Sequence, residues 1–305
     1  DHQAHPGFRI EWWYLTANLD FADGREGGAQ WTLFRQAGRP QDSAEGWDSA
    51  QVWMGHAALT LPDAHFVAER FARGGVGQAG VSGTPFSAWI DHWHMTSEDE
   101  RFNTLALSAQ GEGFAYDLRL EATGPLVLHG DQGLSVKSEQ GQASYYYSQP
   151  HYQVTGTAVI ESQEIQVTGT AWLDREWSSQ PLSGDQTGWD WFSLGFESGE
   201  KLMGFRLRHS DGRHYHSGTW IDPEGEPTAL TPDQLRVTPL ETTQVDGRTI
   251  PTKWALELPD KSLSVEARAL NPQAFMTTIF PYWEGPVHVT GTHTGRGYLE
   301  MTGYE

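Results

Sequence analysis

The sequence predicts an all-β protein made of two antiparallel β-barrels of similar topology, and three observations lead to this prediction. Short segments of alternating hydrophobicity are separated by turn residues at close intervals, and the 305-residue chain contains 34 Gly and 16 Pro. Helical periodicity is hard to find anywhere in the chain. Finally, three motifs of the first half recur in the same order in the second half.

Three stretches carry the strand prediction. Residues 151–173 (HYQVTGTAVIESQEIQVTGTAWL) predict two strands around a tight turn at Glu161–Glu164. Residues 102–122 predict a hairpin, and residues 201–230 predict two strands joined by an Asp-Gly turn. Many short strands with regular turn signals are typical of β-barrels and β-sandwiches.

The recurring motifs divide the chain into two domains. The matching pairs of segments begin at Ile10 and Trp189, at Gly55 and Tyr215, and at Thr168 and Gly295. In the first pair, an acid and two aromatic residues open a strand, a Gly-containing turn follows, and the returning strand ends in Arg. We interpret the series as a diverged duplication and predict one barrel in residues 1–170 and a second in residues 171–305.

Composition excludes several classes of function. The formal net charge of −20 argues against nucleic-acid binding, because neutralising phosphates requires Lys and Arg. No apolar run approaches the roughly 18 residues of a membrane-spanning helix. The absence of Cys rules out a disulfide framework.

Two acids occupy matching positions in the repeat. Glu11 corresponds to Asp190, and Arg35 corresponds to a position near Arg206. A feature present in both halves is more often architectural than catalytic. We therefore predict that Glu11 and Asp190 are structural acids, buried and bonded to Arg or to indole N–H groups.

The segment TAWLDREW contains the candidate catalytic acids. Residues two apart on a strand share a face, so Trp172, Asp174 and Glu176 point one way, and Tyr145 and Tyr147 also share a face. If the two strands are neighbours, an aromatic pocket surrounds a carboxylic acid whose pKa is raised by desolvation. Such an acid could protonate an electron-rich alkene. The alternative is that Asp174 only hydrogen-bonds an indole or caps a turn.

Two pairs of histidines have spacing compatible with zinc binding. His92 and His94, and likewise His214 and His216, are two residues apart. Because nothing in the sequence identifies a third or fourth ligand, we predict no metal at either pair.

A series of motifs resembles one family. The motifs are HPGFRIEWWYLTANL, QWTLFR, ERFARG, PLVLHGD, ASYYYS, WLDREWS, GWDWFSL, YWEGPVHVTG and GYLEMTGY. They are similar to the AttH-like proteins, which are related to the carotenoid 1,2-hydratase superfamily, and the resemblance runs from about residue 5 to residue 304. It implies a calycin architecture of two lipocalin-like barrels and a hydrophobic ligand, such as an isoprenoid or another lipid.

The resemblance also implies a site. The hydratases of this superfamily add water to an isoprenoid double bond by acid catalysis without a cofactor, and their essential Tyr-x-Asp segment matches Trp172-x-Asp174. Their upstream His-x-Trp pair falls on Tyr145-x-Tyr147. The acid is retained and its three partners differ, so the resemblance implies acid chemistry at Asp174, with Glu176 beside it, but not carotenoid hydration itself.

Three functions follow as hypotheses. The first is binding of an elongated lipid or isoprenoid by Tyr145, Tyr147 and Trp172, with or without hydratase-like or isomerase-like conversion by Asp174 and Glu176, in lipid metabolism. The second is a lipid carrier that serves an ABC export system, because members of the family are often exported and encoded near ABC-transporter components. The third is a secreted hydrolase. Under all three we expect a periplasmic or secreted protein.

Overall fold

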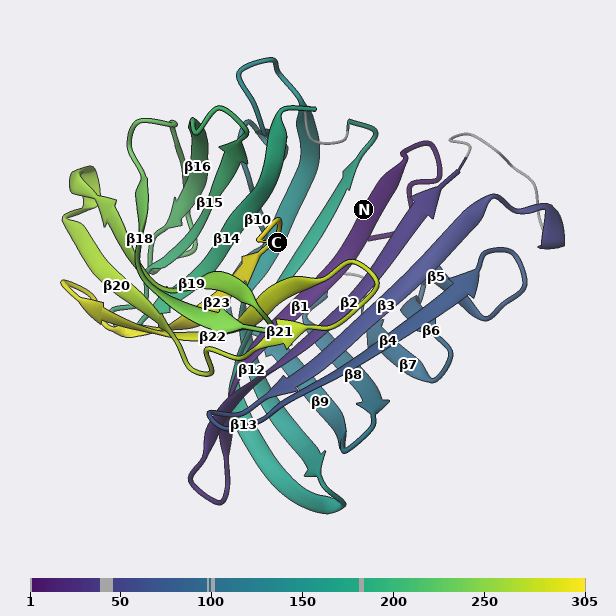
Figure 1. Ribbon diagram of the computed structural model, residues 1–305. Helices are drawn as coiled ribbons and strands as arrows, with labels where there is room; N and C mark the ends of the chain where they lie inside the picture. Colours follow the sequence, from purple (N-terminus) through teal and green to yellow (C-terminus); the bar gives the residue numbers. More distant parts are fainter. Residues whose placement is uncertain (1, 39–45, 98, 100–101, 181–183, 305) are drawn as a thin grey trace. The chain divides into compact units, whose positions relative to one another are not determined.

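The computed structural model describes residues 2–38, 46–97, 99, 102–180 and 184–304. Strands account for well over half of these residues, and the helical part consists of two three-residue 3-10 turns, η1 (Gly46–Asp48) and η2 (Pro259–Lys261). No helix in the described ranges is long and apolar enough to cross a membrane. The prediction of an all-β chain is confirmed (Figure 1).

The chain forms two compact units. The first comprises Asp1–Leu59, Phe66–Leu126 and Ser144–Gln180, and the second comprises Thr60–His65, Val127–Ala143 and Pro181–Glu305. The boundary expected at residue 170 falls inside a strand that continues to Ser178, whereas the two units separate after Gln180.

The first unit is built on one antiparallel sheet. Its strands, in order across the sheet, are β4 (His65–Arg73), β3 (Gln51–Thr60), β2 (Glu26–Ala37), β1 (Ile10–Phe21), β13 (Gln163–Ser178), β12 (Ala143–Ile160), β9 (Phe114–Ala122), β8 (Thr104–Gly111), β7 (Trp93–Ser97), β6 (Phe86–Ile90) and β5 (Ala79–Gly83).

The second unit repeats this order. Its strands are β17 (Pro227–Leu230), β16 (His214–Ile221), β15 (Lys201–His209), β14 (Gln186–Phe196), β23 (Gly295–Met301), β22 (Tyr282–Gly291), β20 (Leu263–Ala269), β19 (Arg248–Leu258) and β18 (Arg236–Val245). The short strands β10 (Val127–Leu128), β11 (Leu134–Val136) and β21 (Phe275–Met276) lie off the two main paths.

The two strand orders confirm the duplication expected from the repeat. In the first unit β1 lies between β2 and β13, and in the second β14 lies between β15 and β23. The three pairs of matching segments begin on or next to β1 and β14, β3 and β16, and β13 and β23. The similar sequence segments therefore occupy equivalent strands.

Tight turns set the register of the hairpins. At Asp246-Gly247, between β18 and β19, both residues have positive φ (48° and 78°), as a two-residue type I′ turn requires. Glu161 and Ser162, between β12 and β13, also have positive φ (49° and 75°). The turn predicted at Glu161–Glu164 is thus present as a two-residue loop that pairs Ile160 with Gln163.

Each sheet curls into a barrel-like arrangement (Figure 1). In the first unit, the hydroxyl of Tyr116 on β9 donates to the main-chain oxygen of Gln30 on β2 at 2.7 Å, although three strands separate β9 and β2 in the sheet. Cross-strand pairs place Tyr116 on the same face as Ile165, and hence as every second residue of β13, including Arg175. That face is the interior of the curl, so Asp174 lies on the outer face.

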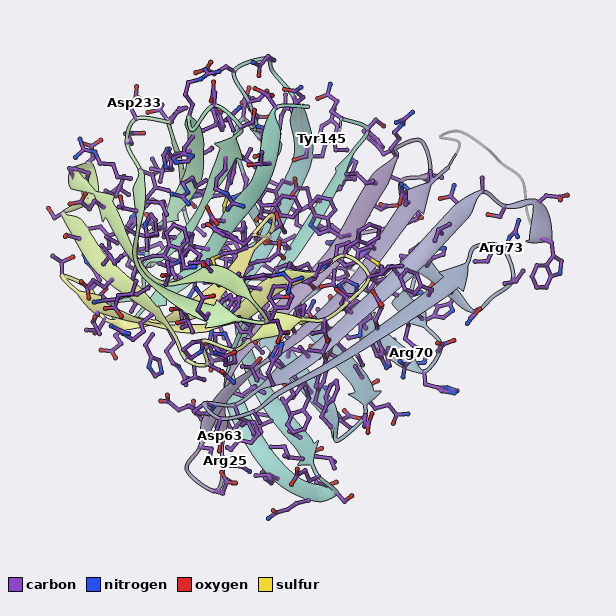
Figure 2. The ribbon with its side chains drawn as sticks, viewed as in Figure 1. Arg25, Asp63, Arg70, Arg73, Tyr145 and Asp233 are labelled. Carbon is purple, nitrogen blue, oxygen red and sulfur yellow. The ribbon has the colours of Figure 1, made fainter. Side chains whose placement is uncertain are left out.

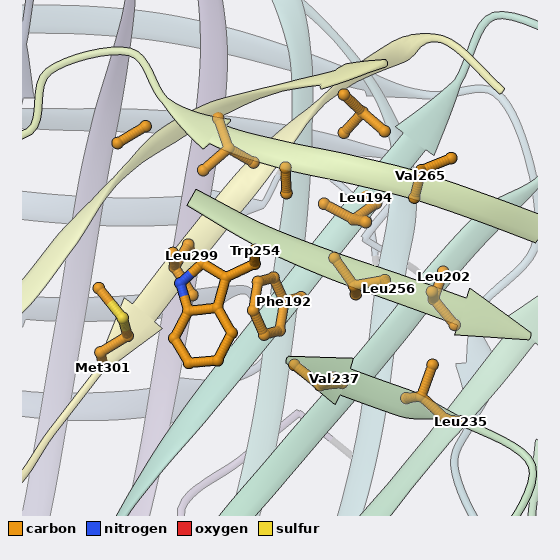
Figure 3. Close-up of a cluster of buried hydrophobic side chains, with 14 of the residues drawn as sticks. Phe192, Leu194, Leu202, Leu235, Val237, Trp254, Leu256, Val265, Leu299 and Met301 are labelled. Carbon is orange, nitrogen blue, oxygen red and sulfur yellow. The ribbon is translucent and has the colours of Figure 1, made fainter. Parts of the chain in front are cut away.

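The second unit encloses an aliphatic and aromatic core. Phe192, Leu194, Trp254 and Leu256 are fully buried there, with Val237 and Met301 beside them (Figure 3). Phe192 and Trp254 meet edge to face, with ring centroids 5.6 Å apart. Alternating residues of β14 and β19 supply these side chains, as expected of strands with one face on a core.

Candidate functional site

Asp174 is a buried carboxyl group with no cation partner among the described residues. Its side chain is 3% exposed on the outer face of β13. Its Oδ1 accepts hydrogen bonds from the Trp172 indole N–H at 2.6 Å and from the Ser148 hydroxyl, and its Oδ2 accepts one from the Tyr146 hydroxyl at 2.6 Å. Asp174 is therefore held by three neutral donors and not by a salt bridge.

The hydrogen bonds leave one acceptor position of Asp174 open. A carboxylate has about four lone-pair sites, and two on Oδ1 and one on Oδ2 are filled by the described residues. The remaining site on Oδ2 is where a proton would reside in the acid form. Asp174 can thus carry a transferable proton without losing any of its three donors.

Burial raises the pKa of Asp174 to about 7. Desolvation is the largest cause, the hydrogen bonds from Ser148, Tyr146 and Trp172 oppose it, and the charge of Glu176 adds to the increase. The direction is the one that we expected from desolvation. Near neutral pH the group exists in both protonation states, which is what a general acid or base requires.

Glu176 lies beside Asp174 on the same face, as the spacing predicted. It is 7% exposed, and its Oε1 accepts a hydrogen bond of 2.5 Å from the Ser144 hydroxyl. Register places Glu176 opposite Tyr146, the same tyrosine that donates to Asp174. The two acids therefore belong to one polar patch on β12 and β13.

The prediction that Tyr145 and Tyr147 lie beside Asp174 was wrong. Asp174 is paired with Ser148, whereas Tyr147 is paired with Arg175 on the opposite face. The cause is an irregularity in β12, where the pairing moves from Tyr152–Ala171 to Gln149–Leu173. Three steps on β12 match two on β13, so the strand contains a one-residue bulge. The bulge exchanges the two faces for the part of β12 that lies beyond it from the turn, which includes Tyr145 and Tyr147.

The two displaced tyrosines contact other aromatic groups on the inner face. The Tyr147 hydroxyl lies 2.6 Å from Nδ1 of His2, and its pKa is raised mainly by burial. The Tyr145 ring stacks on Trp177 at 5.6 Å, and Tyr145 is 45% exposed (labelled in Figure 2). Neither contacts Asp174. Their predicted role in ligand binding, which was based on a position beside Asp174, stays a prediction.

Sequence reasoning missed Tyr146 and Ser148, which bond Asp174 in place of the flanking tyrosines. The signal that could have found them is Pro150, which lies inside a strand pattern. Proline within a strand marks an edge or a bulge because it has no N–H for the ladder. A bulge at Pro150 shifts the register of Tyr145–Ser148 by one residue. Trp172 orients the acid through its indole N–H, and its predicted contact with a ligand stays a prediction.

Glu11 forms the centre of a buried ion cluster on the inner face. Its carboxylate bonds Arg35 Nε and Arg175 Nη2, the latter at 2.5 Å, and all three side chains are at most 2% exposed. Burial alone would raise the pKa of Glu11, but the hydrogen bond from His5 and the charges of Arg175 and Arg35 lower it to about 2. The predicted burial of Glu11 and its pairing with Arg are confirmed, and its structural role stays a prediction.

Asp190 forms the corresponding cluster in the second unit. Its oxygens lie 2.8 Å from Arg206 Nε and 2.5 Å from Arg208 Nη1, and the Tyr304 hydroxyl donates to it at 2.8 Å. Register pairs Asp190 with Arg206 as it pairs Glu11 with Arg35. The burial and the Arg partner predicted for Asp190 are also confirmed.

The histidine pairs differ from each other in the structure. His92 lies in the turn before β7, so only His94 is on the strand, whereas His214 and His216 share a face of β16 with ring centroids 6.3 Å apart. Desolvation lowers the pKa of His216 to about 4. Within the described ranges no three His, Asp or Glu side chains are grouped to hold a metal ion. The absence of a metal stays a prediction.

Comparison with solved structures identifies proteins of similar architecture, and three of them are described in turn. A putative AttH from Nitrosomonas europaea superposes with a TM-score of 0.89 at 32% identity, over 99% of this chain and 94% of that one. Kievitone hydratase from Nectria haematococca gives 0.72 at 15% identity (97% and 89%), and CghA gives 0.61 at 12% (98% and 89%). A search of curated protein sequences gave no match.

The comparisons with kievitone hydratase and CghA concern the fold alone, since their identities are low. They support a two-domain lipocalin-like fold. The family model described as AttH-like matches residues 1–304, and the 32% identical Nitrosomonas structure carries the same description. The chain therefore belongs to the AttH-like family.

Proposed function

We propose that the protein binds an elongated hydrophobic molecule of the lipid or isoprenoid class and converts it by hydratase- or isomerase-like acid-base catalysis at Asp174. The observation that carries the proposal is a buried carboxyl group with a pKa of about 7, three neutral donors and one open proton site. Glu11, which we predict to be a structural acid, is instead paired with Arg and has a lowered pKa.

The chemistry proceeds from the open site on Oδ2. The proton of Asp174 transfers to one carbon of a double bond, whose π electrons form the new C–H bond and leave a carbocation on the neighbouring carbon. A water oxygen then adds to the cation and gives a proton back to the carboxylate; in an isomerisation a neighbouring C–H supplies that proton. Both sequences are redox-neutral and return the acid to its initial state.

The three donors support proton release. After transfer, the carboxylate keeps its hydrogen bonds from Tyr146, Ser148 and Trp172, which stabilise the developing negative charge in a buried setting. The name of kievitone hydratase favours hydration among the reactions that this fold hosts, by analogy only. An ABC-transporter partner and a periplasmic or secreted location come from the family resemblance and are part of the proposal.

Deuterium incorporation tests the proposal even when the product is unknown. The protein is incubated in D2O with geranylgeraniol, squalene or lycopene, and with any molecule that purifies with it and is identified by mass spectrometry. Protonation by Asp174 introduces deuterium at a carbon of the ligand. We expect incorporation by the native protein and none by Asp174→Asn, which keeps the shape of the side chain and removes the proton donor.

A carrier would behave differently. It would retain a hydrophobic molecule through purification and incorporate no deuterium into it, and Asp174→Asn would bind that molecule as the native protein does. That result would reject catalysis and leave lipid binding.

A further inference from the structure

The outer face of the first sheet continues beyond Asp174 as rows of polar side chains. Cross-strand register across β2, β1 and β13 defines three neighbouring rows, which are Thr32–Tyr14–Asp174, Gln30–Thr16–Trp172 and Gly28–Asn18–Thr170. Residues paired across strands share a face. Asp174 thus belongs to a surface that extends over three strands.

Two amide groups on this surface have an unused polar atom. Gln30 is 1% exposed, its Nε2 donates to the Thr32 hydroxyl, and its Oε1 is buried with no hydrogen-bond partner in the described part of the chain. Oδ1 of Asn18 is likewise buried and unpaired within those residues. The Tyr116 hydroxyl holds the main-chain oxygen of Gln30 at 2.7 Å, so the backbone of Gln30 is fixed from the interior.

Buried carbonyl oxygens without a partner are rare because each loses its hydration and gains nothing in return. Here two occur in adjacent rows of one face, next to the row that holds the candidate acid. Neither contributes to the hydrogen bonds of Asp174. Two such oxygens are suited to accept a hydrogen bond from a donor group of a ligand.

We propose that Gln30 and Asn18 form a second polar subsite that binds a hydroxyl group of the molecule acted on at Asp174. This inference rests on the proposed function. A hydroxyl both donates and accepts, so it satisfies the amides in either orientation of their oxygen and nitrogen. The ligand class becomes an unsaturated isoprenoid alcohol and not a hydrocarbon.

The sheet fixes the spacing of the two subsites. Gln30 and Asp174 are on strands separated by one intervening strand and lie one same-face row apart. With strands about 4.8 Å apart and about 3.3 Å per residue, their Cα atoms are about 12 Å from each other. The hydroxyl and the protonated double bond must therefore be well separated along an extended chain.

Binding of two matched probes tests the subsite. Calorimetry would compare geranylgeraniol with the C20 hydrocarbon that lacks only its hydroxyl. We expect the native protein to bind the alcohol at least about 10-fold more tightly, because the hydrocarbon leaves the amides unpaired. Gln30→Met and Asn18→Leu should bring the ratio of the two affinities close to one. Gln36→Met, an exposed position on the same face of β2, should leave the ratio unchanged.

The ratio of the two affinities is measured within each variant. A variant that is partly unfolded binds both probes more weakly, which does not by itself bring the ratio close to one. Equal binding of both probes by the native protein, or failure to bind either, would overturn the subsite. Asp174→Asn separates this inference from the proposed function. If the native protein and Asp174→Asn both prefer the alcohol but the native protein incorporates no deuterium, the subsite is supported and catalysis is rejected. If deuterium incorporation depends on Asp174 but the native protein binds both probes equally, catalysis is supported and the subsite is rejected.

Discussion

The two units carry the same strand order but different chemistry at matching positions. Glu11 on β1 faces Arg35, and Asp190 on β14 faces Arg206. On the neighbouring strand, the position of Asp174, opposite Tyr14, is occupied in the second unit by Tyr298, opposite Ser193. The acid that is paired with Arg is thus present in both units, whereas the second unit has no acid at the position of Asp174, the buried acid without a cation partner among the described residues.

The difference extends to the groups that hold Asp174. By the same register, Tyr146, Ser148 and Trp172 correspond to Glu284, Pro286 and Arg296. None of the three donors is repeated, whereas Glu176 is matched by Glu300. What the fold needs is found in both units. What is found in one unit alone is the better candidate for function, and four predictions test that distinction.

The largest expected effect is on turnover by Asp174→Asn. General acid catalysis is typically worth about 10²–10⁴-fold, so the rate of deuterium incorporation should fall by about that factor, to the background level. The matched control is Tyr298→Phe, at the equivalent position of the second unit, which should leave the rate within about two-fold. Similar losses in both variants would show that the difference between the units has no functional meaning.

The next effect is on stability at the repeated acids. Glu11→Ala and Asp190→Ala should each lower the free energy of unfolding by about 3–5 kcal/mol, because each leaves two Arg side chains, at least one of them buried, without their carboxylate. Chemical denaturation provides the measurement. A loss confined to one unit would mean that the two clusters are not equivalent.

The pH dependence of stability should have opposite signs at the two kinds of acid. The pKa of Glu11 is lowered from 4.5 to about 2, so its contribution is present above about pH 4.5 and lost as the pH falls toward 2. The pKa of Asp174 is raised from 3.8 to about 7, so stability is greatest below about pH 4 and declines as the pH rises through 7. Over its pH range the contribution of Glu11 changes by about 3 kcal/mol and that of Asp174 by about 4 kcal/mol.

Unfolding curves of Glu11→Gln and Asp174→Asn across pH 2–9 would separate the two contributions. Each variant should lack its own slope and keep the other. An Asp174→Asn variant that retains the decline above pH 4 would show that another group causes it.

The smallest expected effect is that of zinc. His214 and His216 share a face of β16, and no third His, Asp or Glu joins them among the described residues. Elemental analysis should find no stoichiometric zinc, and added zinc should not raise the melting temperature. A rise that disappears in His216→Ala would overturn the prediction.

The sequence was sufficient for the fold class, for the duplication and for the acid-Arg pairs, because these depend on local periodicity and on matching segments. It was not sufficient for the partners of Asp174. A regular hairpin built from the loop at Glu161–Ser162 would pair Tyr147 with Glu176 and place both tyrosines on the face of Asp174. The bulge near Pro150 shifts the pairing by one residue, and it changes the face of Tyr145 and Tyr147, which lie 14 to 16 residues before the turn.

The bond between Glu11 and its second partner, Arg175, also could not be predicted from the sequence. The orientation of Arg175 away from Asp174 followed from its odd position on the strand. Its bond to Glu11 depends on the pairing of β1 with β13, which brings together residues 164 positions apart. Local patterns carry no information on such a pairing, whereas β1–β2, which joins Glu11 to Arg35, is a hairpin.

The pairing of β1 with β13 also determines the order in which the chain can assemble during synthesis. The hairpin of β1 and β2 forms early, but the other edge of β1 stays open until the ribosome has released residues 163–178. Until then the unpaired backbone N–H and C=O groups along that edge of β1 are open to pairing with other chains. The same holds for β14, which waits for β23 at the end of the sequence. Each half of the protein therefore closes only when its last long strand arrives, and one edge of its first strand is unpaired in the interval.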